Sequence, residues 1–281
     1  MKFKILVSSS SGLDYIPHSN SIGIIHDIIH YSEDEEYADF IEMKSEAFYN
    51  RLKFDKKSVP TVLPATREEI VEQIEKALKD IYDFVIIILP AKGIVDYEER
   101  MEEVKVGFEN SVRVIQSNLV GYALASMIID LEKSLKSSTD YEAAISVFDK
   151  ANNESVTLFY SPLKDFKINF DEYVIDEQFF YNDKNGSIYM LDCSTLVKLK
   201  LKSEKHPIKE LFKRYLALGA DLSVVPFIMY SSEYSRYNDY FEMKILGVYK
   251  KLKKIKSYPL PPSIGALIGA NVISIGFVNK N

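Results

Sequence analysis

Short apolar runs alternate with helix-like segments along the first half of the chain. Residues 4–7 and the β-branched run at residues 22–30 predict strands. Residues 84–90, FVIIILP, are apolar at every position, as in a strand that helices cover on both faces, and residues 111–117 give a further strand. Strands that alternate with helices predict a mostly parallel sheet between helix layers.

Between these strands the apolar positions follow the helical period. In residues 66–81, Thr66 and Glu69 form a capping box. Ser45 predicts the N-cap of an earlier helix, and Thr139 predicts the cap of a later one. The residues expected on the buried helix faces are Ile70, Ile74, Ala77, Leu78 and Ile81 in the segment 66–81, and Leu124, Met127, Ile128 and Leu131 in a helix after residue 117.

The pattern changes after a polar stretch at residues 149–157, DKANNESVT. We place a domain boundary at Asn152, which divides the chain into an N-terminal α/β domain, residues 1–152, and a C-terminal α/β domain, residues 153–281. The predicted strands of the second domain are 156–162, 186–192, 195–203, 221–231, 266–271 and 273–278, and its predicted helices are 207–219 and 237–252.

Composition narrows the class of protein. The chain has 281 residues, 47% of them apolar, which is enough for a well-buried core. Its 35 basic and 41 acidic residues give a formal charge of -6, so no strong positive field attracts nucleic acid. The single cysteine, Cys193, excludes an internal disulfide and a cysteine-rich metal site, and fits a reducing compartment.

The first residues, MKFKILVSSSS, become polar after Val7, unlike a secretion signal. The densest apolar segments, residues 84–90 and 263–278, are too short or too interrupted to predict a membrane span. We therefore expect a cytoplasmic protein, and we leave a transient contact with a membrane open.

Several segments, in this order, resemble the DegV family of fatty-acid-binding proteins, which serve bacterial fatty acid kinases. Residues 4–13, KILVSSSSGL, resemble its first strand and turn, and residues 23–52 resemble its next block, with a charged turn, Tyr37, Asp39 and a Ser-headed helix. The other similar segments are 60–70 (PTVLPATREEI), 86–99 (IIILPAKGIVDYEE), 112–129 (VRVIQSNLVGYALASMII) and 262–278 (PSIGALIGANVISIGFV).

The resemblance implies a two-domain α/β protein, with a Rossmann-like N-terminal domain that holds a parallel sheet and a mixed α/β C-terminal domain. It implies that a long-chain fatty acid lies in a tunnel between the domains, which makes the chain a carrier or presenter and not an enzyme, with no cofactor besides this ligand. Burial of an acyl chain of about sixteen carbons supplies on the order of 10 kcal/mol before ordering costs. The carboxyl group, in contrast, needs hydrogen-bond donors.

The resemblance also implies head-group contacts. Thr61 matches the family's hydroxyl donor, or it only orders a turn. The family's serines after the buried strand are replaced by Pro90 and Ala91; Lys92 and Gly93 follow and would supply donors instead, unless Lys92 points to solvent.

Asn271 stands where the family has a histidine. An amide donates but does not titrate, so Asn271 either contacts the head group or is an ordinary turn residue. Ser10 and Ser117 keep the serines of two family motifs whose acidic neighbours are lost, and each is either a lipid contact or a strand-end cap. Family members that pass their ligand to a kinase carry a Gly-Gly-Arg-Ile segment. The acidic residues 166–180, FKINFDEYVIDEQFF, have none, which argues against a fatty acid kinase partner.

Two other functions stay open. A small-molecule enzyme would need a phosphate loop, which SSSSGL is not, or Cys193 beside His206 or His30, although Cys193 resembles a buried apolar residue. His26 and His30, four apart in a predicted strand, are too distant for one metal ion. The last alternative is a family member with an interaction role and no bound lipid.

Overall fold

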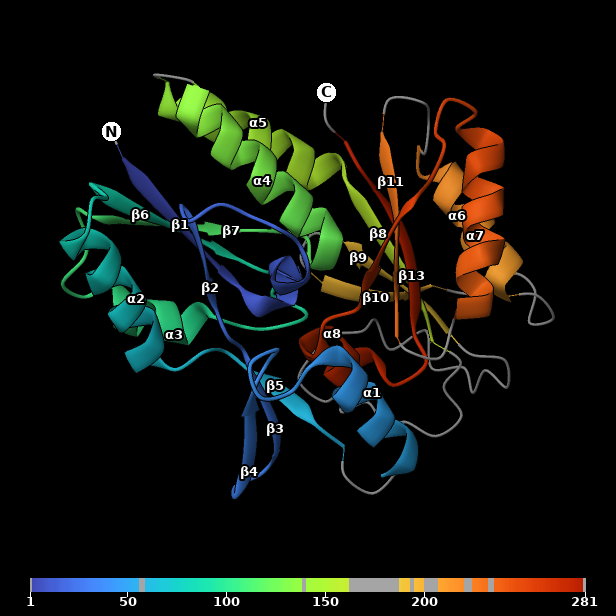
Figure 1. Ribbon diagram of the computed structural model, residues 1–281, viewed down its shortest axis with the longest axis horizontal. Helices are drawn as coiled ribbons and strands as arrows, with labels where there is room; N and C mark the ends of the chain where they lie inside the picture. Colours follow the sequence, from blue (N-terminus) through green and yellow to red (C-terminus); the bar gives the residue numbers. More distant parts are fainter. Residues whose placement is uncertain are drawn as a thin grey trace.

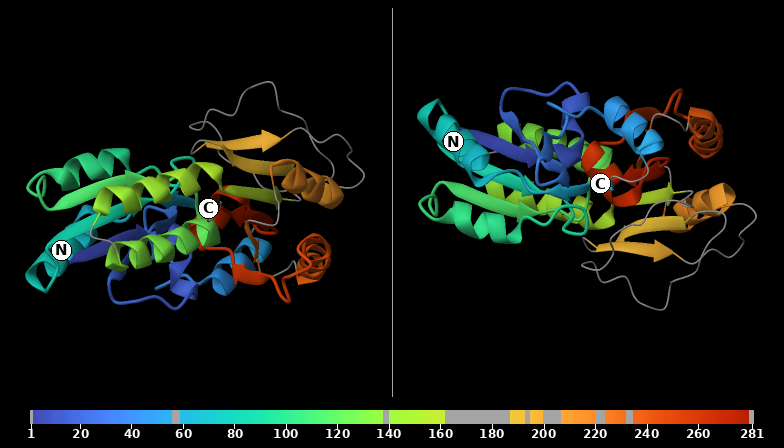
Figure 2. Two further views of the ribbon diagram at one scale, coloured as in Figure 1. Left: turned by 90° about the horizontal axis from the view of Figure 1, so that it is seen from above. Right: turned by 90° about the horizontal axis from the view of Figure 1, so that it is seen from below.

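The computed structural model describes residues 2–55, 59–137, 140–161, 187–192, 195–199, 207–219, 224–231 and 235–279. Its centre consists of two sheets, one of four strands and one of six (Figure 1). We term the part built on the four-stranded sheet the first lobe and the part built on the six-stranded sheet the second lobe. Figure 2 shows the two lobes next to each other, with the helices of the first lobe at one end of the molecule and α6 (Pro207–Ala217) and α7 (Ser235–Val248) at the other.

The sheet of the first lobe has the strand order β2-β1-β6-β7 and is parallel throughout. Helices cover both of its faces (Figure 1), which explains why Ile86, Ile87 and Ile88 are all fully buried. The strands are β1 (Phe3–Ser8), β2 (Ile22–Ile25), β6 (Phe84–Leu89) and β7 (Val112–Gln116), and the helices are α2 (Arg67–Lys79), α3 (Glu98–Lys105), α4 (Gly121–Ser137) and α5 (Tyr141–Glu154).

The predicted strand at residues 22–30 is two strands. β2 ends at Ile25, and β3 (Ile28–Ser32) joins a separate antiparallel sheet of order β4-β3-β5 with β4 (Glu35–Ala38) and β5 (Thr61–Leu63). The break falls at Asp27, whose backbone N–H donates to the Ser9 hydroxyl at 3.1 Å and not to a neighbouring strand. A single strand was therefore the wrong prediction for this run.

The cap of α2 is confirmed, because the Thr66 hydroxyl accepts the Glu69 amide at 3.1 Å. The buried face contains Ile70, Ile74 and Ala77, as expected. Ile81 lies beyond the end of the helix and is exposed, so it does not extend the buried face.

Two other cap predictions are wrong by one residue. α1 (Ser45–Phe54) has Lys44 at its N-cap, and Ser45 is its first residue. α5 is capped by Asp140, whose carboxylate accepts the Ala143 amide at 3.0 Å. Thr139 lies outside the described residues. In both cases a neighbouring polar residue takes the extended conformation that an N-cap requires.

The sheet of the second lobe has the order β10-β9-β8-β13-β11-β12 and is antiparallel except for the β11–β12 pair. It confirms the expected mixed α/β architecture. One face carries α6 and α7 (Figure 1), and an apolar cluster fills the space between. The strands are β8 (Val156–Ser161), β9 (Ser187–Asp192), β10 (Thr195–Leu199), β11 (Val225–Tyr230), β12 (Lys256–Pro259) and β13 (Ile273–Val278).

The predicted strand at residues 266–271 is wrong, because residues 266–268 belong to the helix α8 (Pro262–Ile268) and residues 269–271 are in neither a helix nor a strand. Pro262 suits the first turn of a helix. The small residues of α8 allow it to approach α1 closely: a side chain at Gly265 would overlap the rings of Phe48 and Tyr49. A glycine at position 265 therefore allows α8 to pack closely against α1.

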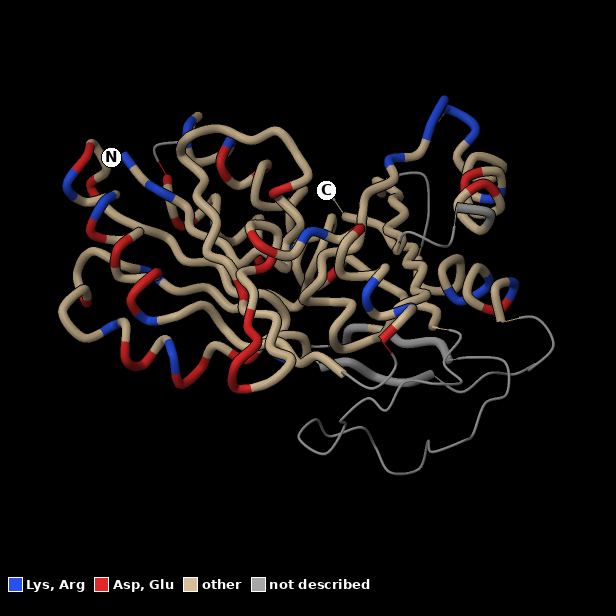
Figure 3. Tube along the Cα trace, turned by 60° about the horizontal axis from the view of Figure 1, so that its bottom comes forward, with Lys and Arg blue, Asp and Glu red and all other residues tan. Residues whose placement is uncertain are grey.

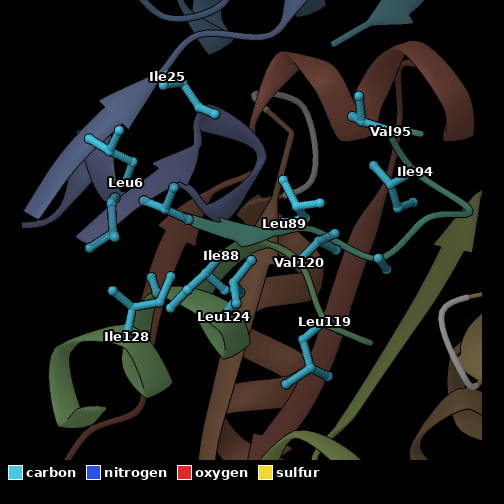
Figure 4. Close-up of a cluster of buried hydrophobic side chains, with 14 of the residues drawn as sticks. Leu6, Ile25, Ile88, Leu89, Ile94, Val95, Leu119, Val120, Leu124 and Ile128 are labelled. Carbon is cyan, nitrogen blue, oxygen red and sulfur yellow. The ribbon is translucent and has the colours of Figure 1, made fainter. Parts of the chain in front are cut away.

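The larger apolar core begins in the first lobe and continues into the second. Figure 4 shows its first part, with Leu6, Ile25 and Ile88 from the parallel sheet and Leu124 and Ile128 from α4. The members that the second lobe contributes include Phe159, Phe227, Met229, Leu260 and Ile264. Asn152 lies in the last turn of α5, shortly before β8 begins, and the division into residues 1–152 and 153–281 remains a proposal. Among the helices of the described residues, none is long and apolar enough to cross a membrane.

Candidate functional site

The candidate site lies at the carboxyl ends of the parallel strands. β1 is one of the two inner strands of this sheet. The chain goes from β1 to β2 on one side and, later, to β6 on the other side of β1. In open α/β sheets a crevice for ligands forms at such a switch point. Here β1 continues into the short 3-10 turn η1 (Ser9–Ser11), and β2 is followed by His26 and Asp27.

Asp27 is the centre of a buried hydrogen-bond network at this edge. Its Oδ2 accepts the Ser8 hydroxyl at 2.6 Å, the Ser9 hydroxyl at 3.2 Å and the Ser10 amide at 3.1 Å. Its Oδ1 accepts the hydroxyl of Tyr97. Burial raises the pKa of Asp27 to about 6, although these hydrogen bonds favour the ionised form.

Asp39 is a second buried acid beside the first. Its Oδ2 accepts the Ser9 hydroxyl at 3.2 Å and the backbone N–H of Ser263 at 3.2 Å. Burial, followed by the charge of Asp27, raises the pKa of Asp39 to about 7. Ser9 has only one hydroxyl proton for two carboxylates, so the pair is stable when one acid is protonated.

The turn that holds Asp39 is strained. Phe40 has a φ of 66°, in the left-handed region that a bulky residue rarely adopts. Its backbone N–H donates to the Met43 carbonyl at 3.0 Å, and its ring meets Tyr15 edge-on at 5.1 Å. These contacts compensate for the unfavourable backbone and fix Asp39 against η1.

His26, which precedes Asp27 in the sequence, is a positive charge paired with two other carboxylates. Its ring nitrogens lie 3.5 Å from Asp14 and 3.3 Å from Glu69. Burial opposes the charged ring, but hydrogen bonds to these two carboxylates outweigh it and raise the pKa of His26 to about 10. His30 pairs instead with Glu36 at 2.8 Å, and no group of ligand side chains among the described residues is arranged to hold a metal ion.

The second lobe closes over this network through α8 and the segment before it. The Ser45 hydroxyl donates to the Leu260 carbonyl at 2.7 Å, and the Tyr49 hydroxyl donates to the Pro261 carbonyl at 3.3 Å. Together with the bond from Ser263 to Asp39, these contacts bring the start of α8 directly against the first lobe.

Three polar atoms around α8 are buried without a hydrogen-bond partner in the described part of the chain: the Ser231 hydroxyl after the end of β11, the Ser263 hydroxyl in the first turn of α8, which lies near the Asp39 carboxylate, and the Oδ1 of Asn271 beyond the end of α8. The Ser231 amide donates to the Val272 carbonyl, and the Leu260 amide donates to the Tyr230 carbonyl. The end of β11, the start of β13 and the segment that leads to α8 therefore meet here. Buried polar atoms without partners indicate a place for water or for the oxygen of a ligand.

The predicted site residues fall in different surroundings. Thr61 is exposed on β5, where it pairs with His30 of β3. Lys92 is also exposed, and its ammonium group pairs with Glu98 and with Asp96, the latter at 3.5 Å. Gly93 next to it is buried.

The two predicted serines are fully buried in networks of their own. The Ser10 hydroxyl lies 2.7 Å from the Ser8 hydroxyl. The Ser117 hydroxyl donates to Asn152 at 2.7 Å and accepts the Leu119 amide at 3.0 Å. Only Asn271 of the predicted residues carries a buried atom without a partner in the described part of the chain.

The sequence patterns did not identify Asp27, Tyr97, Ser231 or Ser263. For Asp27 the available signal was a charged residue inside a β-branched run, which costs free energy unless it is paired. The two serines carry no local signal, because they become buried only when α8, β11 and β13 meet.

Two pockets have linings that include none of Ser231, Ser263 and Asn271. One, of about 290 Å³, lies between α4, α5 and the end of β13. The other, of about 790 Å³, lies between β5 and α3 and is lined mainly by acidic residues of α3; Figure 3 shows Asp and Glu along this side of the first lobe. The apolar residues that line the smaller pocket are Met127, Leu131, Ala144, Phe148, Ala151 and Val278.

Comparison with known proteins agrees with this fold. The model of the DegV family matches residues 2–162. None of the curated proteins matches the sequence.

Solved structures of similar fold cover nearly the whole chain. A fatty acid binding DegV family protein from Thermus thermophilus has 14% identity and a TM-score of 0.83 over 99% of this chain and 100% of its own. A fatty acid binding DegV family protein from Streptococcus agalactiae has 12% identity and a TM-score of 0.84 over 100% of both chains. A stearic acid-binding protein from Eubacterium ventriosum has 14% identity and a TM-score of 0.79 over 99% of this chain and 98% of its own. At such identities the likeness establishes a common fold.

Proposed function

The chain belongs to the DegV family, and from this membership we propose that it binds one long-chain fatty acid in a tunnel between its two lobes and carries or presents it for fatty acid metabolism. The proposal is supported by solved proteins of the same fold that are named for bound fatty acids, among them stearic acid and heptadecanoic acid. The observation in this chain that carries the proposal is the group of buried polar atoms without partners where the lobes meet.

We propose that Ser231, Ser263 and Asn271 hold the carboxyl group. The two hydroxyls can donate to the oxygens of a carboxylate, which then satisfies both of them. The orphaned Oδ1 of Asn271 is an acceptor, so it fits the O–H of a protonated carboxyl group. Asp39 lies beside Ser263 and would repel an anion when ionised. Burial raises the pKa of Asp39 to about 7, so Asp39 keeps its proton more readily than an exposed carboxyl group does, which weakens this repulsion.

The remaining predicted contacts rank behind these three. Thr61 stays a proposed hydroxyl donor. Ser10, Ser117 and Lys92 already have protein partners, and the ligand would have to share or displace those partners. The amide of Gly93 stays a proposed donor as well.

The acyl chain would run along β13 on the side of the sheet that faces α4, and not past Gly121 and Met229, where α4 and β11 are in direct contact. β13 begins two residues after Asn271 and ends at Val278, which lines the smaller pocket. Each buried CH₂ group contributes roughly 0.8 kcal/mol, so the chain supplies the affinity and the polar groups fix the orientation.

The proposal assigns no reaction and no cofactor to this chain, and it places the protein in the cytoplasm. A hydrolase would need Cys193 beside His206 or His30; Cys193 and His206 lie outside the described residues, as do residues 166–180, and His30 pairs with Glu36. Since residues 166–180 contain no Gly-Gly-Arg-Ile segment, a kinase partner is not part of the proposal.

The first experiment is to purify the protein from bacteria, extract it with solvent and analyse the extract by mass spectrometry. We expect stoichiometric long-chain fatty acid. The delipidated protein should then bind a fluorescent fatty acid, and the double variant Ser231→Ala/Ser263→Ala should bind it at least tenfold more weakly. Ser137→Ala, an exposed serine on α4, is the control.

An absence of lipid together with an absence of binding to the fluorescent probe would favour the alternative, a family member that has an interaction role and no lipid. Unchanged affinity of the double variant would reject the assigned head-group residues while it leaves lipid binding intact.

A further inference from the structure

In the six-stranded sheet, every second residue of a strand points toward the first lobe, and the residues between them point toward α6 and α7. Ile273, Ile275 and Phe277 of β13 belong to the cluster beneath α6 and α7. Because side chains alternate along a strand, Ser274 and Gly276 lie on the opposite side, toward α4. On β8 the same alternation places Thr157 and Phe159 on that side.

Thr157 and Ser274 are two further buried hydroxyls without partners in the described part of the chain, and both residues are fully buried. Thr157 pairs with Gly276, two positions from Ser274 on the neighbouring strand. Diagonal neighbours in an antiparallel pair have Cα atoms about 7–8 Å apart, so both hydroxyls can reach one oxygen atom between them.

Other hydroxyls nearby have protein partners. Ser161, on the same side of β8, donates to the Ile268 carbonyl at 3.0 Å. Ser155, just before β8, donates to the Ala151 carbonyl at 2.7 Å. The lack of partners is therefore a property of Thr157 and Ser274 and not of every hydroxyl at this junction.

The path proposed for the acyl chain passes these two residues. It would run along β13 from Asn271 to the pocket at Val278, a distance of about 23 Å for an extended strand. Ser274 lies nearly halfway, and Thr157 lies beside Gly276, further toward the pocket. The ring of Phe227 covers Gly276 on this side, so the acyl chain reaches Thr157 when that ring turns aside. A purely aliphatic chain would cover both hydroxyls and leave them unsatisfied, which is unfavourable.

We propose that Thr157 and Ser274 bind an oxygen atom carried part of the way along the acyl chain, so that the preferred ligand is an oxygenated long-chain fatty acid, such as a mid-chain hydroxy acid. This inference rests on the proposed function and specifies its ligand. A hydroxyl or keto oxygen can accept from both residues, and a hydroxyl can also donate to one of them.

The test is displacement of a fluorescent fatty acid from delipidated protein. The competitors are stearic acid and a series of hydroxystearic acids with the hydroxyl group at different carbons. We expect one positional isomer to bind about tenfold more tightly than stearic acid, since two added hydrogen bonds together correspond to roughly this factor.

The variants Thr157→Val and Ser274→Ala should each reduce this preference and leave the affinity for stearic acid unchanged or higher. Thr157→Ser keeps the hydroxyl and should keep the preference, which separates the hydroxyl from the effect of altered packing. Ser161→Ala removes a hydroxyl that has a protein partner and should also keep the preference.

Equal affinity for stearic acid and every hydroxystearic acid would overturn the inference while the proposed function stands. A preference that persists in both Thr157→Val and Ser274→Ala would overturn the assignment to these residues. If neither the probe nor any competitor binds, the proposed function fails and the inference fails with it.

Discussion

The hydroxyl of Ser45 donates to the carbonyl of Leu260 at 2.7 Å, although the two residues lie 215 positions apart in the sequence. The same hydroxyl lies 2.7 Å from the hydroxyl of Tyr15, whose oxygen also accepts the Ser45 amide. A serine at the first position of α1 thus fixes the chain of the second lobe, just before α8, against the first lobe.

Replacement of this serine should weaken the whole molecule. Ser45→Ala leaves the Leu260 carbonyl and the Tyr15 hydroxyl each short of a partner, so we expect the free energy of unfolding to fall by about 1–3 kcal/mol. Urea denaturation measures this change. The exposed control Ser137→Ala should stay within about 0.5 kcal/mol of the native protein, and equal effects of the two variants would contradict the role of Ser45.

The buried acids predict a fall in stability as the pH rises. Burial and the neighbouring carboxylate raise the pKa of Asp39 from 3.8 to about 7, and burial raises that of Asp27 to about 6. Between pH 4 and these values the unfolded chain has released protons that the folded protein still holds. The free energy of unfolding therefore decreases with pH in this range, by at most about 1.4 kcal/mol per pH unit for each retained proton.

Asp39→Asn removes one of these protons and should flatten the decrease between pH 4 and 7. Asp34→Asn, at an exposed turn, should leave the slope unchanged. Thermal or urea unfolding across this pH range distinguishes the variants, and parallel curves for the native protein and Asp39→Asn would show that Asp39 ionises as it does in the unfolded chain.

The pattern of apolar and polar residues was sufficient to predict those elements whose structure depends on residues close together in the sequence. The central strand β6 is covered by helices on both faces, and its run of isoleucines follows directly from that position. The cap of α2 was equally clear, since Thr66 and Glu69 act within one turn of helix. In contrast, the apolar residues 266–268 were predicted to begin a strand but belong to α8, which packs closely against α1 through Gly265.

The candidate site was predictable only in part. Asn271 entered through the resemblance to a family, whereas Ser231 and Ser263 look like ordinary serines in apolar segments. Their importance comes from burial without a partner, which arises when elements distant in the sequence meet. The β-branched neighbours of Asp27 could have indicated that this acid is buried. Its link through Ser9 to Asp39 has no signal in the sequence.

A basic tip on the second lobe predicts attraction to anionic membranes. Lys250, Lys251, Lys253 and Lys254 follow α7 and are exposed around the exposed Leu252, and Figure 3 shows this blue loop at the edge of the molecule. Each lysine near an anionic surface contributes about 1 kcal/mol at moderate ionic strength.

We therefore expect the protein to sediment with vesicles that contain phosphatidylserine, and to be released by salt. Lys251→Glu/Lys253→Glu should abolish this binding, whereas Lys133→Glu, an exposed residue on α4, should reduce it only slightly. Binding of equal strength to neutral phosphatidylcholine vesicles would refute an electrostatic contact.

The close approach of α4 to β11 gives a last prediction about the junction. Gly121 begins α4 with a φ of 56°, and a Cβ atom there would overlap the sulfur of Met229, which accepts the Tyr122 amide at 3.2 Å. Gly107 also has a positive φ, but the space around it is open. Gly107→Ala should thus cost only the backbone strain, about 1–2 kcal/mol, and Gly121→Ala should cost clearly more, because Met229 must also move. Urea denaturation of both variants measures the difference. Equal losses in the two variants would contradict this prediction. They would mean that Met229 moves aside without cost and that the two lobes are loosely packed at this contact.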